Sequence, residues 1–340
     1  MNLFLFPEAA CFNNGYGIAV DYAYKILKPT EKDIVVWYTN QPREKMLYVR
    51  DDDVVLSKND FFSLRSFLNV LEGKDRTELP KSGLNFLIGK KFERIHCDEV
   101  IFYRALRNLY PHSKISVRFH NCYSRIYDRK KMIGQSLDWK YETKLKNMYR
   151  LEREIFQDKN VFKIFLSDED RYYYTSIFGK TNDSETWAFV PNKELIMTNR
   201  KVPIHFSRKL VWYGGVESHK KASVLWFINS IFPKVKEIIS DVEFHLYGKN
   251  TEVFNSPQDK VFGHGFYDGD GFPEEGALYI NPDIIGGGVK LKLMSLFENG
   301  IPFISTPYGF EGYSSALIDN HYCHVVEIGQ WADYIIKLLC

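Results

Sequence analysis

Short apolar runs alternate with longer amphipathic segments along most of the 340 residues. The run "NLFLF" at 2–6 precedes "YGIAVDYAYKILK" at 16–28, and "DIVVWYT" at 33–39 precedes "FFSLRSFLNVLEG" at 61–73. Strands of a parallel sheet are buried on both faces and read as continuous apolar runs, whereas the helices that cover them show a helical period. The alternation therefore predicts an α/β fold, with parallel sheets covered by helices on both faces.

This rhythm is interrupted once, near the middle of the chain. The stretch 191–209 contains two prolines and little periodicity, which is typical of a connecting segment. The alternation restarts at "KLVWYGG" (209–215), and the chain length suits two domains. We therefore predict an N-terminal domain at 1–195, a linker at 196–208 and a C-terminal domain at 209–340, each Rossmann-like.

Composition limits the possible partners. Hydrophobic residues make up 45% of the chain and the formal net charge is only +2, so we expect no nucleic-acid partner. No segment reads as a signal peptide or reaches the length of a transmembrane helix. The cysteines are odd in number and never spaced as C-x-x-C, which favours reduced thiols in a cytoplasmic protein. They are Cys11, Cys97, Cys122, Cys323 and Cys340.

Three glycine turns follow predicted strands. They are Gly15-Tyr16-Gly17, Gly214-Gly215 and Gly286-Gly287-Gly288. Ligands of open α/β sheets bind beyond the carboxyl ends of the strands, and glycine lets a ligand approach the backbone closely. The start of the following helix offers free N–H groups that suit a phosphate. Glycine turns also occur without ligands, but the two in the second half are each followed by lysines, which favours an anion site.

Other patterns are weaker. "GYGIAV" has Val20 where a dinucleotide-binding fingerprint needs its third glycine, and "GHGFYDG" has the wrong spacing. "RDDDVV" at 50–55 is more typical of a solvated turn than of a metal site. His264 and Asp268 lack a third metal ligand nearby in the sequence. We therefore expect neither a nicotinamide cofactor nor a bound metal.

A set of motifs in the second half is more specific. "LVWYGGVESHKK", "VFGHGFYDG" and "INPDIIGGGVKLKLMSLFENGIPFISTPYGFEGY" occur in one order over about 209–313. Together they resemble glycosyltransferase family 4 (glycosyl transferases group 1), whose GT-B fold has two Rossmann-like domains with parallel sheets facing across a cleft. The first half matches more loosely through "VRFHN", "FLSDED" and "FVPN".

The resemblance implies a glycosyltransferase that uses a nucleotide-diphosphate sugar and a glycan or lipid-linked acceptor. It implies retention of anomeric configuration, no metal, the donor mainly on the C-domain and the acceptor on the N-domain. His120 and Lys292 are the expected catalytic residues. The expected diphosphate and donor contacts are Gly15, Tyr16, Gly17, Gly214, Gly215, Lys220, Lys221, Gly286, Gly287, Gly288, Val289 and Lys290, and the base and ribose contacts are Tyr247, Gly248, Phe266, Tyr267, Ser295 and Glu298.

Residues 124–153 hold nine Lys or Arg against four Asp or Glu. Because acceptors in this family are often lipid-linked, this basic segment suits peripheral contact with the inner face of an anionic membrane. The alternative is an ordinary solvated helix. Family members usually continue beyond the equivalent of Cys340, so we also expect a homo-oligomer to support the domains.

One position departs from the family pattern. The helix that normally carries a glutamate, which accepts hydrogen bonds from the ribose, has Ser295 in "LMSLF". A serine makes fewer and weaker bonds than a carboxylate. Two hypotheses follow: an active transferase with altered ribose recognition, favoured by the lysines and "STPYGFEG", or a non-catalytic GT-B-like subunit that binds a glycan, a nucleotide or a partner transferase. A sugar-nucleotide epimerase is a weaker third.

Overall fold

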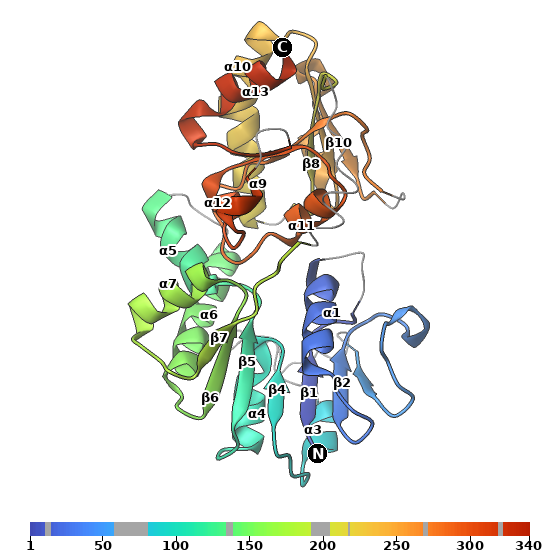
Figure 1. Cartoon of the computed structure of the whole chain (residues 1–340), viewed down its shortest axis with the longest axis vertical. Coiled ribbons are helices and arrows are strands. Elements are labelled where there is room, and N and C mark those ends of the chain that lie inside the picture. The colour runs from blue at the N-terminus through green and yellow to red at the C-terminus, as the bar shows by residue number, and fades with distance from the viewer. Residues whose placement is uncertain are drawn as a thin grey trace. The chain divides into compact units, whose positions relative to one another are not determined.

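The computed structural model describes residues 1–10, 15–57, 81–133, 139–191, 205–216, 218–267, 271–318 and 322–340 (Figure 1). Contacts between residues divide the chain into two compact units. The first unit contains Met1–Asp128 and Trp139–Ala188, and the second contains Arg129–Asp138 and Phe189–Cys340. The predicted linker at 196–208 and the predicted helix at 61–73 lie mostly or wholly outside the described residues.

The first unit is built on a seven-stranded parallel sheet with the order β3-β2-β1-β4-β5-β6-β7. The chain first adds strands to one side of β1 and then continues from β4 on the other side. The topological switch point therefore lies between β1 and β4, where such sheets bind ligands. The strands are β1 (Leu3–Phe6), β2 (Ile34–Tyr38), β3 (Val54–Leu56), β4 (Ile95–Cys97), β5 (Ile115–Phe119), β6 (Val161–Phe165) and β7 (Ser184–Thr186).

Both faces of this sheet are buried. Leu3 and Leu5 of β1 pack into one core, while Phe4 and Phe6 pack into another, because successive side chains of a strand point to opposite faces. Helices α4 and α6 contribute to the first core and α1 to the second. The helices are α1 (Gly15–Leu27), α3 (Lys81–Leu87), α4 (Tyr103–Leu109), α5 (Tyr123–Ile133), α6 (Trp139–Gln157) and α7 (Asp168–Phe178), with short 3₁₀ turns at Arg43–Lys45 and Val100–Phe102.

The second unit repeats the plan with a six-stranded parallel sheet, β10-β9-β8-β11-β12-β13. Leu210 and Trp212 of β8 face one core and Val211 faces the other. The switch point here lies between β8 and β11. The strands are β8 (Lys209–Tyr213), β9 (Glu243–Tyr247), β10 (Val261–Gly265), β11 (Leu278–Asn281), β12 (Phe303–Ser305) and β13 (Cys323–Val325).

Helices cover both faces of the second sheet as well. Trp331 belongs to α13 and Leu293 to α11, and the two lie in opposite cores. The predicted helix at 223–239 is interrupted by a π-helical turn, Phe227–Ile231, just before Pro233, whose ring cannot fit a regular helix. The helices are α9 (Ser218–Trp226), α10 (Phe232–Ile238), α11 (Leu291–Glu298), α12 (Pro307–Phe310) and α13 (Trp331–Leu339), with 3₁₀ turns at Thr251–Phe254, Pro257–Asp259, Ser315–Leu317 and Ile328–Gln330.

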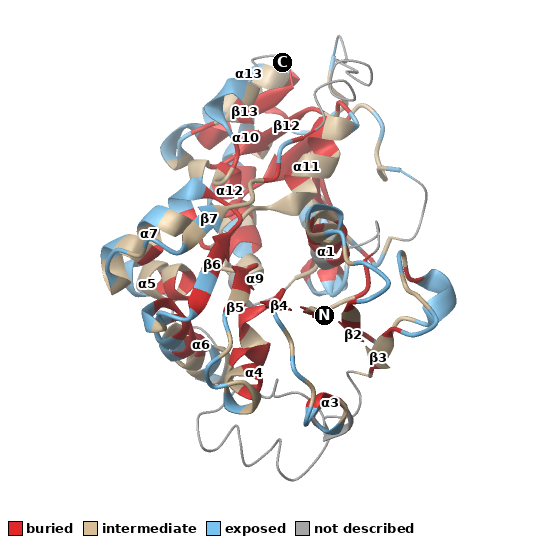
Figure 2. Cartoon of the chain, turned by 60° about the horizontal axis from the view of Figure 1, so that its bottom comes forward, coloured by how far each residue is buried: buried red, intermediate tan, exposed pale blue. Residues whose placement is uncertain are grey.

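Burial follows this layered plan. In Figure 2 the strands of both sheets are largely red, whereas the helices carry pale blue on their outward sides. The predicted α/β class with parallel sheets is therefore confirmed. The solvated turn predicted at 50–55 is wrong at Asp53, which is buried and accepts a hydrogen bond from Trp37 Nε1 at 2.8 Å.

Candidate functional site

The glycine turn after β8 lies beside the end of β9. The N–H of Gly214 donates to the carbonyl of Tyr247 at 2.8 Å. Gly248 has φ of +133°, and a Cβ atom there would lie 2.1 Å from the carbonyl oxygen of Gly214. Only glycine fits such an approach of two backbones. The geometry therefore explains Gly248 by packing, independently of any ligand.

The loop between β11 and α11 lies next to that turn, because β11 pairs with β8. Ser223 Oγ of α9 accepts the N–H of Ile284 at 3.2 Å, and the hydroxyl of Thr306 donates to the carbonyl of Asp283. Lys290 Nζ donates to the carbonyl of Gly288 at 2.8 Å, and Gly288 has φ of +75°. The glycine-rich loop is thus held at the switch point by α9, by the residue after β12 and by its own lysine.

Lys292 is the unusual residue of this loop region. Its side chain is 20% exposed, but Nζ itself is buried and has no hydrogen-bond partner among the described residues. The nearest acid is Asp283, with Oδ2 at 3.9 Å, and the ring centroid of Trp212 lies 5.2 Å away. A buried ammonium without hydrogen bonds is costly, so it indicates a site whose partner binds from outside the chain.

The electrostatics around Lys292 agree with this. Burial lowers its pKa to about 8; Asp283 acts in the opposite direction, and the charges of Lys220 and Lys290 lower the pKa further. Lys220 is half-buried, whereas Lys221 is exposed. Three lysines therefore concentrate positive charge beside one glycine loop, and Asp283 is the acid that acts on the pKa of Lys292. An anion bound there would relieve both their mutual repulsion and the desolvation of Lys292.

Helix α11 begins directly after this loop. Its N-cap residue, Lys290, makes no side-chain capping bond, and its carbonyl accepts from the hydroxyl of Tyr313 at 3.0 Å. Ser295 is half-buried and lies one turn after Lys292, so the two share a face of the helix. Glu298 lies one turn further and contributes to raising the pKa of Tyr313, after burial. Ser295 is thus near the lysine, while Glu298 is near Tyr313.

The predicted base contacts lie on the β9–β10 side of the sheet. The ring of Tyr247 stacks on His264 with centroids 4.3 Å apart, and its hydroxyl donates to Glu274 at 2.7 Å. Tyr267 meets Tyr247 edge-on, with centroids 5.8 Å apart. Phe266 is 77% exposed. Tyr247 is therefore part of the core, and Phe266 is the aromatic ring most accessible to a planar ligand.

In the first unit, His120 follows β5 at the carboxyl edge of the sheet. It is buried, and its Nε2 lies 3.0 Å from Asp98 Oδ2. Arg118 donates to the other oxygen of Asp98 at 3.1 Å, and His96 Nε2 lies 3.2 Å from it. Burial opposes the charge of Asp98, but Arg118 and His120 outweigh that effect and hold its pKa well below its usual range. Burial also lowers the pKa of His120, despite Asp98.

The same network reaches the first glycine turn. Arg118 also donates to the carbonyl of Ala19 in α1 at 2.8 Å. Gly15, Tyr16 and Gly17 form the start of α1, so the network fixes that helix relative to β5. Neither Asp98 nor Arg118 was predicted; Asp98 follows the strand "RIHC", and an acid directly after a strand was the available signal. In the second unit, Asp283 in "NPDIIGGG" was missed in the same way.

The part of the chain that the structure describes was also searched for metal sites and membrane-spanning helices. No group of three or more His, Cys, Asp or Glu residues there is arranged to hold a metal ion. In the same ranges, no helix has the length and apolar character needed to cross a membrane. Cys97, Cys122 and Cys323 are buried, and Cys340 is exposed.

No protein-family model matches the sequence, and no curated protein matches it. Solved structures do match over almost the whole chain. Sucrose-phosphate synthase from Thermosynechococcus elongatus is 12% identical, with 99% of this chain and 88% of that chain covered and a TM-score of 0.56. WaaG, a glycosyltransferase involved in lipopolysaccharide biosynthesis, is 12% identical over 100% and 90%, with a TM-score of 0.56.

A third match is Anabaena HepE in complex with UDP and glucose, 11% identical over 99% of this chain and 88% of that chain, with a TM-score of 0.54. Likeness at this level of identity concerns the fold. Membership of glycosyltransferase family 4, and the role of each site residue, stay predictions. The two parallel sheets, together with these matches along the whole chain, show that the protein has the GT-B fold of glycosyltransferases.

Proposed function

We propose that this protein is a glycosyltransferase that moves a sugar from a nucleotide-diphosphate sugar to a glycan or lipid-linked glycan. The observation that carries the proposal is Lys292, whose buried Nζ has no hydrogen-bond partner among the described residues and lies beside a glycine loop at the switch point of the second sheet. Phosphate oxygens are strong acceptors for such an ammonium. Two of the matched structures, a glycosyltransferase and a complex with UDP and glucose, are consistent with this ligand class.

The expected role of the lysines follows from the reaction. As the bond between the sugar and the diphosphate breaks, negative charge grows on the leaving phosphate. Positive groups fixed in advance stabilise this transition state more than the ground state. Lys292, supported by Lys220 and Lys290, supplies that charge, and the backbone of Gly287 and Gly288 lets the phosphate approach. Because lysines supply the charge, we expect transfer without a metal. Retention at the anomeric carbon is expected from the family resemblance.

His120 is the proposed catalytic residue of the first unit. Since Asp98 is ionised and can only accept, the hydrogen between them belongs to His120 Nε2, which fixes the tautomer of the ring. Burial keeps the imidazole neutral at pH 7. A neutral ring in a fixed orientation suits hydrogen bonding to a sugar hydroxyl. We propose that His120 contacts the donor sugar or polarises the acceptor hydroxyl.

The exposed end of α5 bears on where in the cell the protein works. Lys131 and Met132 are neighbouring exposed residues of α5, and Met132 is 85% accessible. Exposed apolar and cationic side chains together suit peripheral contact with an anionic membrane. We therefore propose a cytoplasmic enzyme, peripheral at the inner face of the membrane, in surface polysaccharide or glycoconjugate synthesis.

The alternative is a non-catalytic GT-B-like subunit, and Ser295 favours it. Where the resembling family has a glutamate, the half-buried Ser295 offers only a neutral hydroxyl. Such a subunit would still bind a nucleotide, a glycan or a partner transferase, but it would not release nucleoside diphosphate from a nucleotide sugar. Turnover of bound nucleotide sugars therefore separates the two functions.

The experiment is a thermal-shift screen of common nucleoside diphosphates and nucleotide sugars against wild type and Lys292→Met. Methionine keeps the stem beside Trp212 and removes only the charge. We expect at least one nucleotide to stabilise the wild type and Lys292→Met to weaken its binding about 100-fold, the cost of one charge-assisted contact. Lys234→Met, at an exposed position of α10, is the control and should bind normally.

Two results would oppose the proposal. If no nucleotide binds at about millimolar concentration, where even weak specific ligands are detected, the enzyme hypothesis fails. If nucleotides bind equally to wild type and Lys292→Met, the site is elsewhere. A nucleotide that binds at Lys292 but is never turned over supports the non-catalytic subunit.

A further inference from the structure

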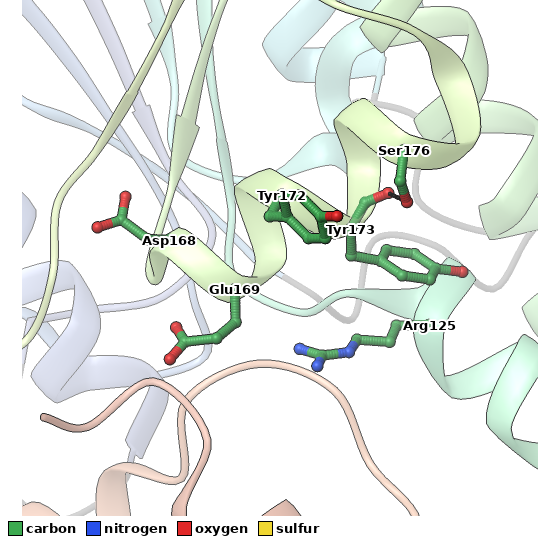
Figure 3. A pocket seen from close by; sticks show the side chains of 6 residues that line it. All are labelled: Arg125, Asp168, Glu169, Tyr172, Tyr173 and Ser176. Atoms are coloured by element: carbon green, nitrogen blue, oxygen red, sulfur yellow. Dashed lines mark hydrogen bonds between the residues drawn. The ribbon is translucent and has the colours of Figure 1, made fainter. Parts of the chain in front are cut away.

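An open cavity of about 520 Å³ lies in the first unit, between the first turn of α5 and residues 168–176 of α7 (Figure 3). Both helices start at the carboxyl ends of neighbouring strands, β5 and β6. Arg125 on its wall is five residues after His120. The cavity is therefore on the same edge of the sheet as His120. Its lining residues are Arg125, Asp168, Glu169, Tyr172, Tyr173 and Ser176.

Three of these side chains are held from outside the cavity. Arg125 donates to the buried Asp170 at 3.1 Å, and the hydroxyl of Tyr173 donates to Asp128 at 2.5 Å. Asp168 accepts from the hydroxyl of Thr186 in β7 at 2.6 Å. Side chains whose orientation is fixed in advance lose little entropy when a ligand arrives. The cavity is therefore a formed site, although it is open.

Two further side chains have no partner. Tyr172 is 76% exposed, and neither it nor the exposed Glu169 makes a side-chain contact with another described residue. In Figure 3 the side chains of Tyr172 and Tyr173 lie above those of Arg125 and Glu169. The helix dipole accounts for acids in the first turn of α7, but not for a large exposed aromatic ring beside them. An aromatic ring and a carboxylate that both face a cavity without partners indicate a ligand.

The chemistry of the lining points to a neutral sugar. The flat ring of Tyr172 suits the apolar face of a pyranose, and the carboxylates of Asp168 and Glu169 accept hydrogen bonds from hydroxyl groups. The positive charge of Arg125 is already paired with Asp170, so the two acids leave the cavity negative. That charge disfavours phosphates and uronic acids. The cavity is also far larger than one sugar ring, so the sugar would keep part of its hydration and its glycosidic links.

We infer that this cavity is a subsite for a neutral sugar residue of the acceptor glycan. The acceptor role rests on the proposed function, because the cavity lies at the same edge of the sheet as His120, the proposed catalytic residue of this unit. Tyr172 supplies the stacking surface and Glu169 orients the hydroxyls. Binding of the sugar itself requires neither the nucleotide nor Lys292.

The experiment measures oligosaccharide binding without nucleotide, by ligand-observed NMR and calorimetry. The probes are neutral hexamers of glucose, mannose and xylose, with an oligogalacturonate as the acidic comparison. We expect one neutral probe or more to bind, Tyr172→Ala to weaken it about tenfold or more, and Glu169→Gln to weaken it by a smaller factor. Ile88→Ala and Glu237→Gln, which change exposed side chains elsewhere, should bind as the wild type does.

Lys292→Met separates the two proposals. If it abolishes nucleotide binding and leaves oligosaccharide binding unchanged, the subsite is independent of the donor site, as inferred. Once turnover is measured, Tyr172→Ala should raise the KM for the acceptor and leave hydrolysis of the nucleotide sugar unchanged.

The inference is overturned if no neutral probe binds at about 10 mM, the upper end of weak specific affinities. It is equally overturned if the acidic probe binds more tightly, or if Tyr172→Ala keeps wild-type affinity. Neutral probes that bind through Tyr172 to a protein that never binds a nucleotide support the sugar site and remove its acceptor role. In that case the proposed glycosyltransferase function is contradicted, whereas sugar binding in the cavity is supported.

Discussion

The two sheets have the same kind of topology, and both place buried charges at their carboxyl edge, but they treat those charges differently. In the first unit, Asp98 has Arg118, His96 and His120 within 3.0–3.2 Å. In the second, the buried Nζ of Lys292 has one acid at 3.9 Å and no hydrogen bond among the described residues. A charge that is compensated by hydrogen bonds fixes a structure. A buried charge without hydrogen bonds, here called uncompensated although Asp283 pairs with it at 3.9 Å, keeps donors that a ligand can satisfy. The comparison is consistent with a positioned framework at the first edge and with the anion site that we propose at the second.

The largest expected effect tests the compensated side. Asp98→Ala leaves the buried Arg118 without its carboxylate, and removing one partner of a buried ion pair typically costs about 3–5 kcal/mol. We expect the free energy of unfolding, measured in urea, to fall by about that amount. Asp52→Ala is the matched control, because Asp52 is 68% exposed and lies 3.6 Å from Arg50, so its loss should cost less than about 1 kcal/mol.

If Asp98→Ala is as stable as the control, the charges of the first unit are not coupled as the distances imply. The two edges would then not differ in the way described. If Asp98→Ala loses stability but binds nucleotide as the wild type does, the charges of the first unit serve to hold the structure.

The next effect tests the uncompensated side through pH. Burial lowers the pKa of Lys292 to about 8, below its model-peptide value near 10.4. Between these values the unfolded chain binds more protons than the folded one, so this residue makes stability rise as pH rises. The contribution is at most about 1.4 kcal/mol per pH unit. Buried thiols such as Cys97, whose pKa burial raises to about 12, act in the opposite direction over the same range.

The variant Lys292→Met isolates the contribution of Lys292 to the pH dependence of stability. Unfolding of wild type and variant is measured from pH 7 to pH 10, and the difference in free energy should move in favour of the wild type above about pH 8. Nucleotide affinity of the wild type should fall over the same interval, since the neutral amine no longer attracts phosphate. If the difference in unfolding free energy between wild type and variant does not depend on pH, Lys292 is solvated and is not a buried charge.

The sequence sufficed for the fold because apolar runs and helical periods are local properties. Strands β1, β2 and β8 follow from continuous apolar runs, and their parallel pairing follows from the alternation with helices. Short edge elements escaped: β7 reads "SET" and has no buried residue. The third strand also escaped, because "VVL" directly follows three aspartates.

Site residues could be proposed from the sequence only where a combination of residue types at a strand end has one common function. The glycines and lysines at 286–292 could be found because an anion loop needs both at a strand end. Asp98 carried only the signal of an acid directly after a strand, and its pairing with Arg118 could not be predicted, since that depends on β4 pairing with β5, which is a tertiary contact. Tyr172 was invisible for a different reason: an exposed tyrosine on a helix has no pattern, and only the cavity beside it gives it a role.

The smallest expected effect concerns Ser295, half-buried on the same face of α11 as Lys292. If the ribose of a bound nucleotide lies there, Ser295→Glu adds charge-assisted hydrogen bonds to its hydroxyls, and affinity should rise by a factor of about 3 to 10. In Ser295→Gln the new side chain is nearly as large as glutamate but uncharged, so nucleotide affinity should change little. Calorimetry with the best nucleotide from the thermal screen measures both. If both variants bind more weakly, Ser295 lies tightly against the ligand and size, not charge, explains the serine; if only glutamate does, the helix face meets phosphate instead of ribose.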